Sequence, residues 1–85
     1  MGISFEHVVN RVAELLVISA EQVLARGKDK ETVTAGSILC FWATTEIAIS
    51  QVELAQKLKV SQPAVSMAVR RGGQLISRNS YALKG

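Results

Sequence analysis

A polar face on the helix expected over residues 61–71 carries the residue types best suited to a specific chemistry. The face remains once the apolar positions of that helix are assigned to a core. Glutamine can pair with N6 and N7 of adenine, serine can bond to base edges, and apolar groups can touch the methyl group of thymine. The candidate base contacts are Gln62, Pro63, Ser66 and Met67.

Cations and helix N-termini lie near this face in the sequence. A basic side chain can neutralise a phosphate, and free N–H groups at a helix N-terminus can bind its oxygens. The charged stretch 26–31, read as a surface loop, adds two lysines, although Asp29 and Glu31 beside them oppose contact with a polyanion. The candidate phosphate contacts are Arg70, Arg71, Lys57, Lys59, Lys28 and Lys30 through charge, and Ser50 and Ser61 through helix N-terminal amides.

Capping signals predict two short helices over residues 51–58 and 61–71. Ser50 with Glu53 has the spacing of a capping box, in which a serine hydroxyl and a glutamate bond to each other's backbone N–H. Ser61 stands where an N-cap residue is expected, shortly before Pro63, which is favoured in a first helical turn. The two helices and their short connection form a helix-turn-helix pattern.

Packing positions fit this pattern. Ala55 and Val65 stand at the fifth and fifteenth positions of a unit that starts at Gln51, where two crossed helices must approach closely. Lys59 occupies the turn position at which glycine is common, because the backbone there often has a positive φ. A lysine in that conformation costs about 1 kcal/mol. An ordinary αα-hairpin is the alternative reading.

Residues for catalysis or metal binding are not grouped in the sequence. His7 is the single histidine and Cys40 the single cysteine, so no thiolate zinc cluster or disulfide framework can form within one chain. Cys40 is expected to be a buried small hydrophobe, and His7 a surface residue. We expect no cofactor, no metal and no enzymatic activity.

The elements that position the helix-turn-helix are expected to form a small all-α bundle of five to six helices. Helical spacing of apolar residues predicts helices over 5–16, 19–25, 32–47, 51–58 and 61–71, with a possible short helix over 73–79. The helix over 32–47 is apolar on more than one side, as is typical of a central helix. Gly72 and Gly73 predict the end of the recognition helix over 61–71. Leu75 and Ile76 are expected to return to the core.

Composition allows one small domain over residues 1–85. The chain is 48% hydrophobic, which is ample for a core, and has a net charge of +3. One base and three acids give the first 25 residues a charge of −2, whereas nine bases and four acids give the remainder +5. A basic C-terminal part suits a polyanionic partner, although soluble domains also carry surface lysines. No apolar run is long enough for a membrane span, so we expect a cytoplasmic protein.

Two motifs give this sequence a family resemblance. Val-Ser-Gln-Pro-Ala-Val-Ser at 60–66 resembles the start of the recognition helix in many bacterial helix-turn-helix regulators. Residues 5–72 also resemble the C-terminal DNA-binding domain of the bacterial chromosomal replication initiator, through the turn at 17–24, the basic loop and the long helix with Leu-Cys-Phe-Trp at 39–42. The resemblance implies a Trp-repressor-like all-α fold.

The chain departs from the initiator at two positions. Val60–Val65 replaces the initiator's Gly-Arg-Asp-His-Thr-Thr signature, and Ala35-Gly36 replaces an Ala-Arg pair. The sequence is more similar to the initiator-like domain appended to REP-associated tyrosine transposases, through Ser-Gln-Pro-Ala-Val-Ser at 61–66, Ala-Val-Arg-Arg-Gly at 68–72 and Tyr81. The resemblance implies part of a larger protein with a catalytic domain. Tyr81 has no His-x-His pair to serve a transposase reaction.

The function expected from these patterns is sequence-specific binding of double-stranded DNA, as the DNA-targeting domain of a transposase-like protein. The alternative is a protein-interaction or homodimerisation module that binds no nucleic acid. Its evidence is a surplus of apolar residues that a small core would not hide, namely Val17, Ile18, Ile47 and Ile49.

Overall fold

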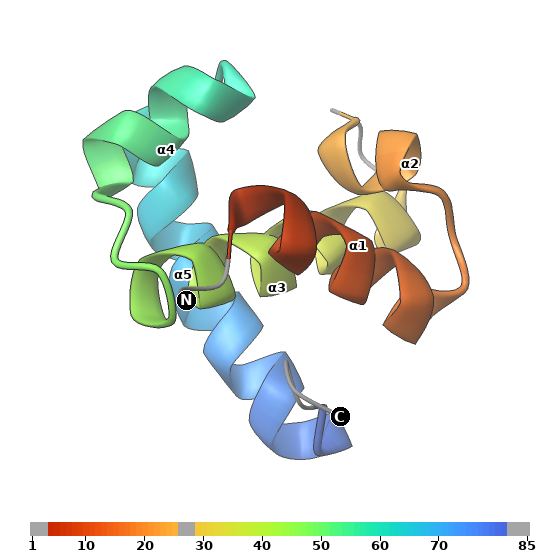
Figure 1. Ribbon diagram of the computed structural model, residues 1–85. Coiled ribbons are helices and arrows are strands. Elements are labelled where there is room, and N and C mark those ends of the chain that lie inside the picture. Colours follow the sequence, from red (N-terminus) through yellow and green to blue (C-terminus); the bar gives the residue numbers. More distant parts are fainter. Residues whose placement is uncertain (1–3, 26–28, 82–85) are drawn as a thin grey trace.

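The computed structural model describes residues 4–25 and 29–81, and these residues form five helices with no strand among them (Figure 1). The helices are α1 (Phe5–Leu16), α2 (Ala20–Leu24), α3 (Lys30–Thr45), α4 (Gln51–Leu58) and α5 (Gln62–Asn79). The expected all-α bundle is confirmed.

The central helix is α3, which contacts each of the other four helices (Figure 1). On one side its Leu39 joins a buried cluster with Val8 and Val12 of α1. On the other side its Ala43 joins a second cluster with Leu54 of α4. Because both sides of α3 are covered, the prediction that the helix over residues 32–47 is the central one is confirmed.

Serine side chains begin four of the five helices. The hydroxyl oxygens of Ser4, Ser19, Ser50 and Ser61 each accept the backbone N–H three residues further on, at 3.1 to 3.3 Å. An N-cap of this kind stabilises a helix by about 1 kcal/mol. The predicted serine N-caps of α4 and α5, on which the helix-turn-helix depends, are therefore confirmed. Of the capping box predicted at Ser50 and Glu53, the hydrogen bond from the N–H of Glu53 to the Ser50 hydroxyl is present.

Left-handed residues, none of them glycine, end three helices. Val17, Lys59 and Ser80 follow α1, α4 and α5 with φ of 56°, 58° and 56°. After each of them, the next backbone N–H donates to the carbonyl oxygen five positions earlier, at 3.0 to 3.2 Å. This arrangement closes the helix end as a glycine would in a Schellman motif.

The prediction that Gly72 and Gly73 end the recognition helix is wrong. α5 continues through both glycines to Asn79, and the short helix expected over 73–79 is its second half. The reason is tertiary: α5 crosses α3 so closely at Gly72 that a Cβ atom there would overlap the carbonyl oxygen of Ser37 and lie 2.8 Å from Cβ of Phe41. Gly72 permits this close approach, and the extension brings Leu75 against the core, as expected.

The boundaries of α3 also differ from the prediction of 32–47. The helix begins two residues earlier, so Lys30 and Glu31 belong to its first turn and not to the loop. It ends earlier because Ala48 adopts a left-handed conformation (φ 56°), and the N–H of Ile49 folds back to the carbonyl oxygen of Ala43 at 3.0 Å. α2 is shorter than the predicted 19–25, because Ser19 is its N-cap and Ala25 its C-cap.

Candidate nucleic-acid interface

The helix-turn-helix consists of α4, a three-residue connection and α5, and it is anchored on α3. Leu54, Ala55 and Val65 are buried in the cluster that α4 and α5 share with α3. The close-packing positions predicted at Ala55 and Val65 are therefore confirmed. Lys59 in the connection has φ 58° and ψ 45°, the left-handed conformation that the sequence predicted for it.

The outward face of α5 is the stripe formed by Pro63, Met67, Arg70 and Gln74, which recur every three or four residues and are all exposed. Met67 keeps 64% of its side-chain surface exposed, which is unusual for an apolar residue of its size. On the opposite side of the helix, Val65 and the buried Gly72 face the core. The separation of the two sides leaves the stripe open to a partner.

The four candidate base contacts lie together on the first two turns of α5. Pro63 and Met67 belong to the outward face, and Gln62 and Ser66, four residues apart, lie side by side along one flank of it. All four are exposed. Polar hydrogen-bonding groups and apolar contact groups thus share one surface at the N-terminal end of a helix.

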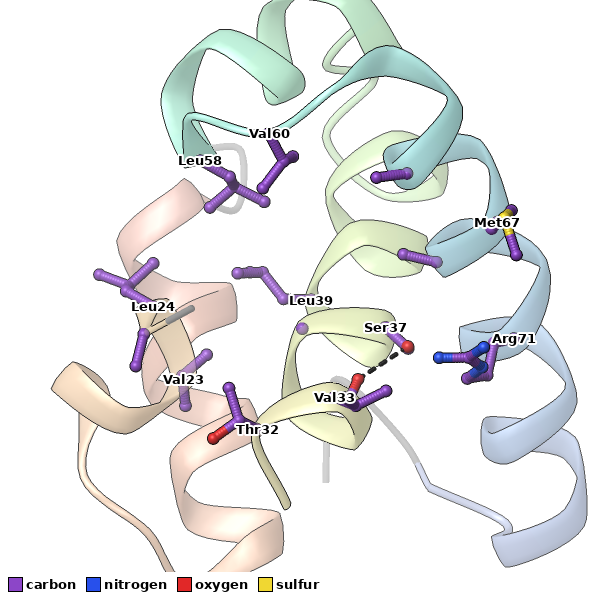
Figure 2. A pocket seen from close by; sticks show the side chains of 14 residues that line it. Val23, Leu24, Thr32, Val33, Ser37, Leu39, Leu58, Val60, Met67 and Arg71 are labelled. Carbon is purple, nitrogen blue, oxygen red and sulfur yellow. Dashed lines mark hydrogen bonds between the residues drawn. The ribbon is translucent and has the colours of Figure 1, made fainter. Parts of the chain in front are cut away.

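The two arginines at the middle of α5 point in different directions, although adjacent in sequence. Arg70 belongs to the outward face and lines a shallow hollow with Gln74. Arg71, one residue further around the helix, lines a cavity between α5 and α3, and Figure 2 shows its guanidinium directed toward that cavity. The sequence treated both as phosphate contacts; only Arg70 shares the outward face with the candidate base contacts.

Arg78 is a cation that sequence reasoning missed. It lies eight residues after Arg70, about 12 Å further along the helix, and lines the same hollow as Arg70 and Gln74. The residue was overlooked because Gly72 and Gly73 were read as a helix end. The spacing of Arg70, Gln74 and Arg78 at successive fourth positions was the available signal.

Two of the lysines predicted to contact phosphates, Lys57 and Lys59, lie away from the outward face. Lys57 stands over the ring of Phe5, with its Nζ atom 5.2 Å from the ring centroid, which is a cation–π contact. Lys57 and Lys59 line a hollow on the side of α4 that meets α1 and α2. Lys30 is exposed in the first turn of α3, and Lys28 lies outside the described residues.

The two helix N-termini differ in the amides they leave for a phosphate. At α4, Ser50 accepts from the N–H of Glu53, and the first two N–H groups of the helix have no partner within the helix. At α5, Ser61 accepts from Ala64, and Pro63 has no N–H, so Gln62 supplies the remaining amide. The N-terminus of α4 therefore offers more free amides to a phosphate than the N-terminus of α5 does.

The single cysteine, the single histidine and Tyr81 lie in different environments outside this surface. Cys40 is buried, and burial raises the pKa of its thiol to about 11, so little of it is thiolate at neutral pH. His7 is exposed on α1, and Tyr81 packs against the first core cluster. Among the described residues, no group of three or more His, Cys, Asp or Glu side chains is placed to hold a metal ion.

Four apolar residues were the evidence for the alternative, a protein-interaction module. Of these four, Val17 is exposed, with 90% of its surface accessible to solvent. Ile18, Ile47 and Ile49 are partly buried and pack against the two core clusters. The described residues also expose Leu24, Val52 and Met67, so the interaction module stays the alternative prediction. Within residues 4–25 and 29–81, no helix has both the length and the apolar character needed to cross a membrane.

Comparison of the chain with protein-family models, with curated proteins and with solved structures finds no match.

Proposed function

We propose that the chain binds double-stranded DNA in a sequence-specific manner, with α5 as the recognition helix, and that it serves as the DNA-targeting domain of a transposase-like protein. The observation that carries the proposal is the exposed group of Gln62, Pro63, Ser66 and Met67 on the first two turns of α5. In helix-turn-helix proteins the N-terminal residues of the second helix contact base edges in the major groove.

Each candidate base contact has a distinct chemical role. The carboxamide of Gln62 can donate to N7 and accept from N6 of adenine, and the hydroxyl of Ser66 can donate or accept at a neighbouring base. Pro63 and Met67 offer apolar surface to the methyl group of thymine. An exposed methionine between polar neighbours is better explained by such a contact than by solvation, because its apolar surface is removed from water on binding.

Phosphate contacts would hold α5 in register. Arg70 and Arg78 lie on the same side of α5, about 12 Å apart along the helix. The free amides at the start of α4, next to Ser50, can bind a phosphate oxygen on the flanking strand. The described residues of α4, its connection to α5 and α5 itself carry five basic side chains and the single acid Glu53, so the surface complements a polyanion.

The resemblance to the initiator-like domain of transposases supports the proposal that this domain belongs to a transposase-like protein. It does not support an origin box as the DNA target. The position at which the initiator has an arginine is Gly36 here, and it lies on the cavity wall of α3. Gly36 can supply no phosphate contact through a side chain. We therefore infer a target other than the origin box.

The proposal is tested by selecting duplexes from a random pool and titrating the best one by fluorescence anisotropy. We expect Gln62→Ala to lower the preference for the selected site over a scrambled site by about 1–3 kcal/mol, because a base contact is lost. Arg70→Ala should weaken binding to both duplexes alike, and Arg70→Lys should retain most of the affinity. Asn10→Ala, an exposed amide on α1, is the matched control. If neither Gln62→Ala nor Arg70→Ala changes binding to any duplex, the outward face is not the interface.

A further inference from the structure

A cavity of about 360 Å³ lies between α2, the first half of α3 and the helix-turn-helix (Figure 2). Its wall is formed mainly by apolar side chains, among them Val23, Leu39, Leu58 and Ala68. The volume is within the range of small-molecule sites in proteins. At roughly 30 Å³ for each water-sized group, it has room for about a dozen non-hydrogen atoms.

The described charged residues that line this cavity and the hollow beside it are all basic. Arg71 is exposed at the edge of the cavity with its guanidinium directed inward (Figure 2), and its side chain has no hydrogen bond or ion pair with another described residue. A neighbouring hollow shares Leu24 and Leu58 with the cavity and is flanked by Lys57 and Lys59. Neither lining includes a described aspartate or glutamate. The electrostatic field at the opening therefore favours an anion.

The buried hydroxyl of the wall is already hydrogen-bonded within α3. The hydroxyl of Ser37 donates to the carbonyl oxygen of Val33 at 2.8 Å, as Figure 2 shows, and Thr32 lies near the edge. Arg71 is thus the one charged group on the lining, and its planar guanidinium can hold a carboxylate through two parallel hydrogen bonds. A ligand that matches this wall has an apolar body and one anionic end.

We propose that this cavity is a binding site for a small organic carboxylate with an aromatic or branched apolar body, its carboxylate held by Arg71. The ligand's apolar part would lie against Val23, Leu39 and Leu58. The inference goes beyond DNA binding and does not depend on it, because Arg71 lies on the side of α5 away from Gln62 and Ser66. Met67 lines the cavity as well as the outward face, so it is the one candidate base contact that the two sites share.

The test uses the uniformly ¹⁵N-labelled chain and a matched pair of probes, naphthalene-1-acetate and the uncharged 2-(1-naphthyl)ethanol. A ligand of this size bound at roughly 0.3 kcal/mol per atom has a dissociation constant on the order of 1 mM. We expect the acid to shift amide signals of residues around the cavity and to bind about tenfold more tightly than the alcohol. Equal binding of the two probes, or no binding at roughly 10 mM, would overturn the proposal.

Two variants locate the site. Arg71→Gln should reduce the affinity for the acid to that for the alcohol, whereas Arg70→Gln, the adjacent arginine on the outward face, should leave the preference intact. Gly36→Leu should abolish binding of both probes, because a Cβ at this cavity-lining residue meets nothing within 4 Å and the added side chain would occupy the open space. If the preference survives in Arg71→Gln, or Arg70→Gln removes it, the assignment of the anionic end is wrong.

Discussion

Replacing Gly72 by alanine is the most informative perturbation of the scaffold that holds α5. A Cβ atom at this position would overlap the carbonyl oxygen of Ser37 and would lie 2.7 Å from its carbonyl carbon and 2.8 Å from Cβ of Phe41. Backbone atoms and a Cβ cannot rotate away. α3 and α5 would therefore have to separate where the helices cross.

Two opposing terms determine the magnitude of this effect. Alanine is favoured over glycine in a helix by about 1 kcal/mol. Overpacking a tight site costs about 1–3 kcal/mol, and more where backbone must move. We expect Gly72→Ala to lower the free energy of unfolding by about 2 kcal/mol, out of a total of roughly 4–13 kcal/mol for 85 residues. The melting temperature should fall by roughly 8–16 °C.

Urea and thermal unfolding followed by far-ultraviolet circular dichroism measure this change, and two other glycines supply the comparison. At Gly36 a Cβ meets nothing within 4 Å, so Gly36→Ala should raise the unfolding free energy by about 1 kcal/mol. At Gly73 the nearest atom is Cε1 of Phe41 at 2.9 Å, at the end of a ring that can rotate, so the effect should be intermediate. A Gly72→Ala variant as stable as the unmodified chain would refute the close crossing of α3 and α5.

Three further predictions concern single side chains. Lys59→Gly should raise the free energy of unfolding by up to about 1 kcal/mol in urea titrations, because residue 59 has φ 58°; a lower value would show that the lysine side chain outweighs the backbone term. Burial raises the pKa of Cys40 from 9.0 to about 11, so the stability that the buried neutral thiol contributes is fully present below pH 9 and is lost as the pH rises through 11. In Cys40→Ala the free energy of unfolding should therefore decline less steeply between pH 9 and pH 11; an unchanged decline would contradict the burial of this thiol. Arg78→Ala should weaken binding to every DNA sequence alike and reduce the salt slope by about 1 in anisotropy titrations, whereas a sequence-dependent loss would place Arg78 at a base.

Local signals predicted the helices that local hydrogen bonds define. The bounds 5–16 and 51–58 match α1 and α4, because a serine cap begins each helix and amphipathic spacing continues it. The apolar character of α3 was likewise sufficient to identify it as central. Such features depend on residues three or four positions apart, which a single sequence displays directly.

The wrong helix end at Gly72, and the unforeseen surroundings of Lys57 and Arg71, both depend on partners distant in the sequence. Gly72 lies inside α5, where the helix passes the backbone of Ser37 on α3. No residue within a few positions of Gly72 in the sequence indicates this contact. Lys57 is placed against Phe5, more than fifty residues earlier, and Arg71 faces a cavity built by α2 and α3. The shared exposed surface of Gln62, Pro63, Ser66 and Met67 was easier to foresee, since they all lie within the first two turns of one helix; their contact with bases stays a prediction.

The dependence of DNA affinity on salt tests the central claim most directly. The two cationic phosphate contacts, Arg70 and Arg78, predict a slope of about −1.8 in log K against log salt, which is a loss of affinity of roughly 12-fold between 50 and 200 mM. An interface formed through apolar contacts with a protein partner would hardly weaken over that range. We expect a slope of about −1.8 for the selected duplex. The absence of duplex binding at 50 mM salt, or a slope near zero, would contradict the assignment of α5 as a DNA-recognition helix.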